Sequence, residues 1–189
     1  MTPADPPGPR RRGQGPGADS RAPAVTPSFP DLTLLDDAAR TIGTIPAVAL
    51  PGAHIPAFYA YWLSSARSDG LPDVSAIDPV LMPPEILPFM VVYAVEPDQG
   101  LRMRLIGTAV VDRTGTDLTG RVIEPYGVMA TLHARLSWCL KHRRPYVALG
   151  QVPAAERDFI HFTALAAPFA DKSGAVQRMA SVLHFDAPG

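Results

Sequence analysis

The stretch GTDLTGRV, Gly115 to Val122, contains two glycines separated by four residues, which is the spacing of a phosphate-binding loop. In a loop of the G-x-x-x-x-G-K-[ST] type, backbone N–H groups surround the phosphates, a lysine contacts them and a hydroxyl binds magnesium. Here Arg121 occupies the lysine position and Val122 the hydroxyl position. Because the residues that act on a nucleotide are missing, we expect the two glycines to serve the backbone instead.

The elements around these glycines favour the same interpretation. A phosphate-binding loop must follow a strand directly, whereas here a strand should end near Gly107 and TAVVDRT then provides about two helical turns. Gly115 is well placed as the left-handed C-cap of that short helix, since glycine takes this conformation at little cost. Thr116 or Asp117 can cap a second, single-turn helix that Gly120 closes.

Two further residues could take part in covalent or proton-transfer chemistry. The single cysteine, Cys139, excludes an internal disulfide and a multi-cysteine metal site, and it lies on the apolar face of an expected helix as a small hydrophobic residue. Asp112 lies on the short helix, and no histidine is aimed at it. Without paired carboxylates, a serine elbow or a triad, we expect no enzyme; the alternative is a small α+β pocket enzyme that transfers a proton.

Two histidines are expected to face each other on neighbouring strands. If the turn DKSG is tight, Asp171 pairs with Gly174, and His161 then lies opposite His184. The apolar residues that alternate with them must face the interior, so both histidines point outward. Two ligands are too few for zinc. We interpret the pair as having no function, and a pH-sensitive contact between two subunits is the alternative.

Composition limits the class of protein. The chain has 189 residues, 47% of them hydrophobic, and a formal net charge of −1. These values predict one domain with a core, and the charge argues against a nucleic-acid partner. No apolar run approaches the roughly 20 residues of a membrane-spanning helix. The arginines at 10–12 are not followed by an apolar stretch, so we expect no signal peptide and a cytoplasmic protein without a membrane partner.

The chain divides into three parts by its pattern. Residues 1–30 hold eight of the 22 prolines and no apolar periodicity, which predicts a disordered tail rich in proline, glycine and arginine. Residues 31–56 should form a leading helix, with Asp31 as its N-cap and Gly43 as its stop, and then an irregular segment. Residues 57–187 should form the domain. The apolar positions with helical spacing in the leading helix are Leu32, Leu35, Ala39 and Ile42.

Within the domain, helical and alternating patterns follow one another. An amphipathic helix with an aromatic stripe comes first and ends at Gly70, and a second long helix contains Met129, Leu132 and Leu136. The segment LRMRL alternates, with Leu101, Met103 and Leu105 expected to point inward. With short connections, the order predicts an α+β fold: a five-stranded antiparallel sheet with helices on one face, preceded by N-terminal helices. The stripe is Ile55, Phe58, Tyr59, Trp62 and Leu63, and the strands are 89–95, 101–105, 146–151, 159–169 and 176–185.

The order of several short motifs resembles PAS domains, and in particular a bacterial variant found as small single-domain proteins. RLIGTAVVDRTGTDLTGR looks like the strand, short helices and G-x-D-L-T-G turn of that family. The resemblance covers roughly residues 58–185. The other motifs occur in the order of the family and at fitting intervals: Trp62, Gly70-Leu71-Pro72, Ile77-Asp78-Pro79, Leu87-Pro88, the R-L-x-G-T of 104–108, Pro145 and APFADKSGAV.

The resemblance implies a non-enzymatic sensory or signalling module. Such domains hold a small ligand, or nothing, between the sheet and its crossover helices, and they commonly pair through helices before the first strand. The aromatic stripe would then cover the outer sheet face, its own or that of a second subunit in a homodimer. No Asn-Cys-Arg segment of the photoactive flavin variants is present, and a haem-binding sensor using His133 is an alternative. The cofactor, ligand and any signalling partner stay unassigned, with a small apolar ligand expected against Met103, Leu105, Met129, Leu132, Phe162, Ala164, Met179 and Leu183.

Overall fold

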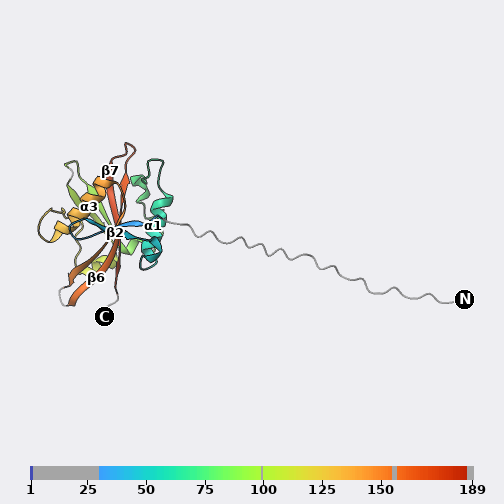
Figure 1. Cartoon of the computed structure of the whole chain (residues 1–189), viewed down its shortest axis with the longest axis horizontal. Coiled ribbons are helices and arrows are strands. Elements are labelled where there is room, and N and C mark those ends of the chain that lie inside the picture. Colours follow the sequence, from blue (N-terminus) through green and yellow to red (C-terminus); the bar gives the residue numbers. More distant parts are fainter. Residues whose placement is uncertain (2–29, 99, 155–156, 187–189) are drawn as a thin grey trace.

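The computed structural model describes residues 1, 30–98, 100–154 and 157–186, and they form a mixed α+β domain around one seven-stranded sheet (Figure 1). The strand order is β2-β1-β5-β6-β7-β3-β4. The last five strands of this order pair antiparallel, as the sequence predicts. The strands are β1 (Leu32–Leu35), β2 (Thr41–Ile45), β3 (Met90–Val95), β4 (Leu101–Ile106), β5 (Tyr146–Ala154), β6 (Arg157–Ala170) and β7 (Val176–Phe185).

The two additional strands replace the predicted leading helix, which is wrong. β1 pairs parallel with β5, and β2 pairs antiparallel with β1. The turn between them holds Ala39 at φ +57°, a left-handed conformation that a helix cannot contain. The carboxylate of Asp36 accepts hydrogen bonds from the backbone N–H groups of Ala38 and Arg40 at 3.0 and 2.8 Å, and these bonds stabilise the turn.

Helices cover both faces of the sheet, and Figure 1 shows α1 and α3 on opposite sides of it. The ring of Trp138, on α3, meets Tyr146 of β5 edge-on, so the crossover helices lie on one face, called the inner face here. α1 lies on the other, outer face, which is the face that the resemblance implies for its aromatic stripe. The helices are α1 (His54–Ser64), α2 (Thr108–Thr114) and α3 (Ala130–His142), with short 3-10 turns η1 (Ala47–Ala49), η2 (Val74–Ala76), η3 (Leu87–Phe89) and η4 (Gly127–Met129).

The aromatic stripe of α1 is buried against the outer face of its own sheet. Phe58 is fully buried, and its ring centroid lies 6.5 Å from that of Phe169 on β6. The indole N–H of Trp62 donates to the carbonyl of Pro168 at 2.9 Å. The stripe is expected to cover the outer sheet face either of its own chain or of a second subunit. It covers the face of its own chain, so these rings are not exposed for a partner.

The paired glycines act on backbone geometry. Gly115 ends α2 at φ +72°, and its N–H donates to the carbonyl of Val111 at 2.7 Å, as the C-cap prediction requires. Asp117 accepts from the N–H of Thr119, but this closes a turn, so the predicted second short helix does not form. From Gly120, at φ +86°, the chain runs along the edge of β4, where Met103 N donates to the carbonyl of Arg121 at 2.9 Å.

Gly107 explains why two of the short motifs occur together. A Cβ atom at Gly107 would lie 2.3 Å from the carbonyl oxygen of Pro88 and 2.6 Å from that of Leu87. The glycine of R-L-x-G-T therefore lies directly against the Leu-Pro that precedes β3, where only glycine fits. This contact sets the position at which α2 leaves the sheet toward the inner face.

Candidate functional site

The middle of the inner face carries a buried pair of hydroxyl groups. Tyr93 on β3 and Ser181 on β7 are 3% and 4% exposed, and their oxygen atoms lie 2.9 Å apart. Burial raises the pKa of Tyr93 to about 12, although the hydrogen bond with Ser181 acts in the opposite direction. The phenol is therefore neutral near pH 7, and the pair is a polar position on a mostly apolar surface that also carries the buried phenol of Tyr146.

Two of the predicted lining residues flank this pair. Met103 on β4 and Met179 on β7 are the direct neighbours of Tyr93 in the two adjoining strands, and all three side chains are buried. Strand alternation places them on the face that carries Ser181. The sequence-based grouping of Met103 with Met179 thus corresponds to one continuous patch of the inner face.

A second group of predicted residues lies farther along the same face. Ala164 is paired with Leu183, and Phe162 is paired with Phe185, with the two rings edge-on at 6.4 Å. The ring of Phe162 also lies over Gly150, where an added Cβ would come 2.4 Å from the ring. Phe162 and Leu183 are only half-buried, so this end of the inner face is incompletely covered.

Met129 and Leu132 approach the core from the crossover helices. Met129 ends η4 and Leu132 lies in the first turn of α3, and both are half-buried and pack against the core. Seven of the eight predicted residues are therefore on the inner face or on the elements that cover it. They surround an apolar surface with the Tyr93–Ser181 pair at its middle.

Leu105 is on the opposite face, so its predicted inward direction is wrong. β4 has a β-bulge, because Val92 pairs with Leu105 while the next residue, Tyr93, pairs with Met103. The extra residue, Arg104, interrupts the alternation, and Leu105 points to the outer face with 40% exposure. Simple alternation in LRMRL does not reveal the bulge.

The predicted pairing of His161 with His184 is also wrong. Thr163 lies opposite His184, because the turn pairs Asp171 with Ala175 instead of Gly174, and the β6–β7 register shifts by one more residue between Phe169 and Ala170. The slip is two residues, which preserves the face of every side chain, so both histidines do point to the outer face. His184 instead lies against His54, the first residue of α1, with ring centroids 5.4 Å apart.

The remaining candidates for chemistry have local roles. Cys139 is fully buried, which raises the pKa of its thiol, and its S–H donates to the carbonyl of Arg144. His133 lies 3.4 Å from the hydroxyl of Ser137 on its own helix. Asp112 is exposed on α2. Within the part of the chain that the structure describes, no three His, Cys, Asp or Glu side chains gather as a metal site, and no helix is long and apolar enough to cross a bilayer.

A comparison against protein families identifies the domain that contains this face. A family model described as a PAS domain matches residues 53–184. The chain belongs to the PAS domain family. The match begins one residue before α1 and ends within β7, so it contains all five antiparallel strands of the PAS domain, and the β1–β2 hairpin precedes it.

Several solved structures resemble this PAS domain at low identity. The light-state structure of the Aureochrome1 LOV photoreceptor is 12% identical, with a TM-score of 0.42, covering 59% of this chain and 89% of that chain. The PAS domain of Bordetella pertussis BvgS is 17% identical, with a TM-score of 0.40, and the match covers 52% of this chain and 76% of that chain. The Rhodobacter sphaeroides LOV protein is 14% identical, with a TM-score of 0.40, and the match covers 53% of this chain and 60% of that chain. Among curated proteins, none matches the chain.

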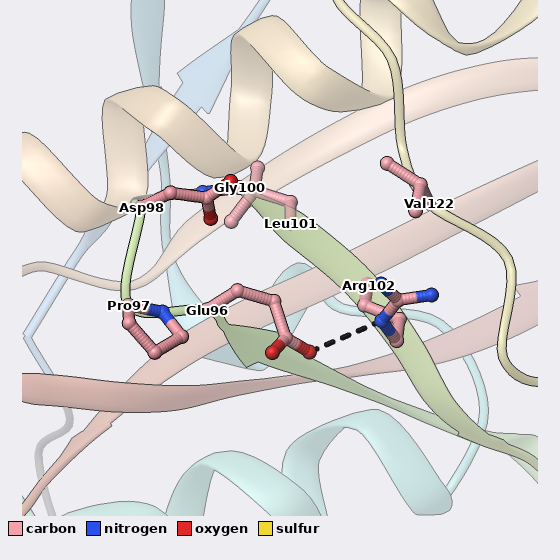
Figure 2. A pocket seen from close by; sticks show the side chains of 7 residues that line it. All are labelled: Glu96, Pro97, Asp98, Gly100, Leu101, Arg102 and Val122. Atoms are coloured by element: carbon pink, nitrogen blue, oxygen red, sulfur yellow. Dashed lines mark hydrogen bonds and ion pairs between the residues drawn. The ribbon is translucent and has the colours of Figure 1, made fainter.

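Figure 2 shows a cleft of about 320 Å³ in the PAS domain, at the end of the β3–β4 hairpin. Glu96 and Arg102 point toward each other across it, and Arg102 Nε donates to Glu96 Oε1 at 3.1 Å. Arg102 Nη1 also donates to the carbonyl of Gly120, and Val122 lines the cleft from the neighbouring segment. The bonds of Arg102 connect the β3–β4 hairpin to the segment that contains Gly120. Because the charged groups of this cleft are already bonded to each other and to the backbone, we keep the inner face as the candidate ligand site.

Proposed function

We propose that this PAS domain is a non-enzymatic sensory module that binds a small, mostly apolar ligand on its inner sheet face. The observation that carries the proposal is the Tyr93–Ser181 pair within an apolar surface whose far end, at Phe162 and Leu183, is incompletely covered. A mainly hydrophobic lining with few polar groups is typical of small-molecule sites. A ligand with one hydrogen-bonding group would use the hydroxyl pair for orientation.

The signal would leave the domain through α1 on the outer face. α1 is bonded to the sheet through Trp62, at the carbonyl of Pro168, and through His54, at the carbonyl of Leu183. Leu183 also has its side chain on the inner face, and it is paired with Ala164. A ligand that moves β6 and β7 would therefore shift the carbonyl groups to which α1 is attached, and a homodimer or a signalling protein would read that shift.

Native mass spectrometry of the full chain purified from its own host tests this function. We expect a bound molecule of small mass that is lost on denaturation. Ala164→Phe adds a ring to the inner face and should remove the bound mass. Ala175→Phe makes the same replacement at an exposed turn position and is the matched control.

Two results would contradict the proposal. One is a chain that carries no bound molecule after purification from the host. The other is a bound molecule whose occupancy is the same in Ala164→Phe and in the wild type, because the ligand would then lie outside the inner face. Sedimentation of the same samples with and without the ligand measures the proposed change in dimerisation.

A further inference from the structure

The outer sheet face has a second and larger cleft, of about 680 Å³, beside the region that α1 covers. Its floor is formed by side chains of β3 and β4, one wall by the η2 segment, and the other wall by the start of β7. The volume is within the range of small-molecule sites, roughly 300–1,000 Å³. The apolar lining residues are Val74, Ile77, Pro79, Met90, Val92 and Leu105.

The β-bulge in β4 creates the chemical character of this cleft. Regular alternation would put Arg104 and Leu105 on opposite faces of the sheet, but the bulge turns both toward the outer face, where both line the cleft. An exposed apolar side chain thus lies next to a guanidinium group. Bulges frequently redirect side chains at binding sites, so this departure from the sequence pattern is an indication of a site.

Two guanidinium groups bring positive charge to the cleft. Arg104 on β4 and Arg178 on β7 lie on either side of β3, and among the described residues neither has a carboxylate partner. Arg178 donates one bond, to the carbonyl of Gln177 at 2.8 Å. By contrast, Arg67 and Arg102 near the cleft are both paired with carboxylates.

Asp171 also lines the cleft, and its carboxylate oxygens already accept hydrogen bonds within the β6–β7 turn. Asp171 Oδ1 accepts from the N–H and hydroxyl of Ser173 and from the N–H of Ala175, and Oδ2 accepts from Gln177. These bonds hold the β6–β7 turn and lower the pKa of Asp171. The carboxylate therefore stabilises the turn and keeps its own negative charge, and the cleft presents two guanidinium groups and this one carboxylate beside an apolar floor.

We propose that this cleft binds a free single-chain carboxylic acid of the fatty-acid type. Its carboxylate would lie between Arg104 and Arg178, whose N–H groups match the two oxygens of a carboxylate. Its alkyl chain would cover Met90, Val92 and Leu105. The sheet separates this site from the inner face, so the proposal does not depend on the function proposed above, and a chain with two ligands is compatible with both.

Calorimetric titration of the full chain with dodecanoate, below its micelle concentration, tests the site. Dodecanol has the same alkyl chain without the charge and is the matched probe. We expect dodecanoate to bind at least about ten-fold more tightly than dodecanol, and the preference should decrease at high salt. Equal affinity for the two probes would indicate a purely apolar occupant and would overturn the proposal.

Variants locate the bound acid. Arg104→Gln and Arg178→Gln should each weaken dodecanoate binding by about ten-fold and leave dodecanol binding nearly unchanged. Arg113→Gln, an exposed arginine on α2, is the control and should bind like the wild type. Dodecanoate binding that is insensitive to Arg104 and Arg178 but lost in Ala164→Phe would place the acid on the inner face, and absence of binding at millimolar dodecanoate would also reject the site.

Discussion

His54 Nε2 lies 3.0 Å from the carbonyl oxygen of Leu183, so the first residue of α1 is bonded to the last strand of the sheet. The carbonyl can only accept, so Nε2–H donates to it, and both the neutral and the protonated ring can make this bond. The same ring is stacked on Phe89 at 4.1 Å and lies against His184 at 5.4 Å. The attachment of α1 to the sheet thus includes an ionisable imidazole ring.

We predict that the domain loses stability as the pH falls below about 6.5. Burial is the main cause that lowers the pKa of His54, and the neighbouring His184 lowers it further, whereas the bond to Leu183 raises it. The unfolded chain then binds the proton more readily than the folded chain, so stability is complete above the unfolded pKa and decreases as the pH falls toward the folded pKa. Thermal melts between pH 7.5 and 5 measure the slope.

The variant His54→Phe should reduce this pH slope, because it keeps a ring on Phe89 and removes the titrating group. His161→Phe replaces an exposed ring and is the matched control. If His54→Phe and the wild type have the same slope, protonation of His54 does not weaken the attachment of α1.

Arg135 connects α3 to the β1–β2 hairpin, and we predict that Arg135→Ala destabilises the domain by about 2–4 kcal/mol. Its side chain is 7% exposed; Nε donates to the carbonyl of Asp36, and Nη2 donates to the carbonyl of Leu149 and to Asp37 Oδ1. Removal of the guanidinium leaves two backbone carbonyls without these donors. Chemical denaturation measures the loss.

Asp37→Ala is the control for this prediction. The carboxylate is 83% exposed, so its ion pair with Arg135 should contribute only about 0–1 kcal/mol. A loss as large for Asp37→Ala as for Arg135→Ala would mean that the ion pair, and not the bonds to the hairpin and β5 carbonyls, stabilises this junction.

The sequence predicts the five antiparallel strands because each has a regular pattern and the helices between them are strongly periodic. The hairpin at 31–45 escapes prediction because Leu32 and Leu35 fit a helical spacing as well as a short strand, and the pairing of β1 with β5 decides between them. A bulge changes the face of Leu105, and a bulge together with a turn one residue wider than expected changes the register of His184. Bulges depend on the neighbouring strand, which local alternation does not include.

His54 could not be identified as the neighbour of His184 from sequence, since 129 residues separate it from the strand carbonyl that it contacts. Its only local signal was its position just before the aromatic stripe of α1. The inner-face residues were predictable for the opposite reason. An error of two residues in a strand register leaves every side chain on its correct face, so Ala164 and Leu183 were grouped correctly despite the slip.

We predict that three glycine-to-alanine substitutions differ in effect because the glycines have different roles. Gly107→Ala should cost at least about 2–3 kcal/mol or prevent folding, since the new methyl would overlap the carbonyl of Pro88. Gly115→Ala should cost about 1 kcal/mol, because φ is +72° but nothing lies within 4 Å of the added Cβ.

Gly43→Ala is the control for this series. The position is in β2, has no left-handed φ and has open space around it, so alanine should change the stability by less than about 1 kcal/mol and in the stabilising direction. Urea denaturation of the three variants measures their free energies of unfolding and so ranks the three losses of stability. If Gly115→Ala is as harmless as Gly43→Ala, then the C-cap is not the reason for the glycine spacing in GTDLTGRV.

The Tyr93–Ser181 pair gives a final prediction, because both hydroxyls are buried and bonded to each other across β3 and β7. Tyr93→Phe and Ser181→Ala should each cost about 1–2 kcal/mol, since each leaves one buried hydroxyl without its partner. The double variant should cost about 1 kcal/mol less than the sum of the two, because it removes both groups. Additive losses would mean that the hydroxyls do not interact. Because ligand orientation is proposed to depend on this pair, the double variant should also keep its fold while binding the native ligand more weakly, and the bound fraction in native mass spectrometry measures that separately from stability.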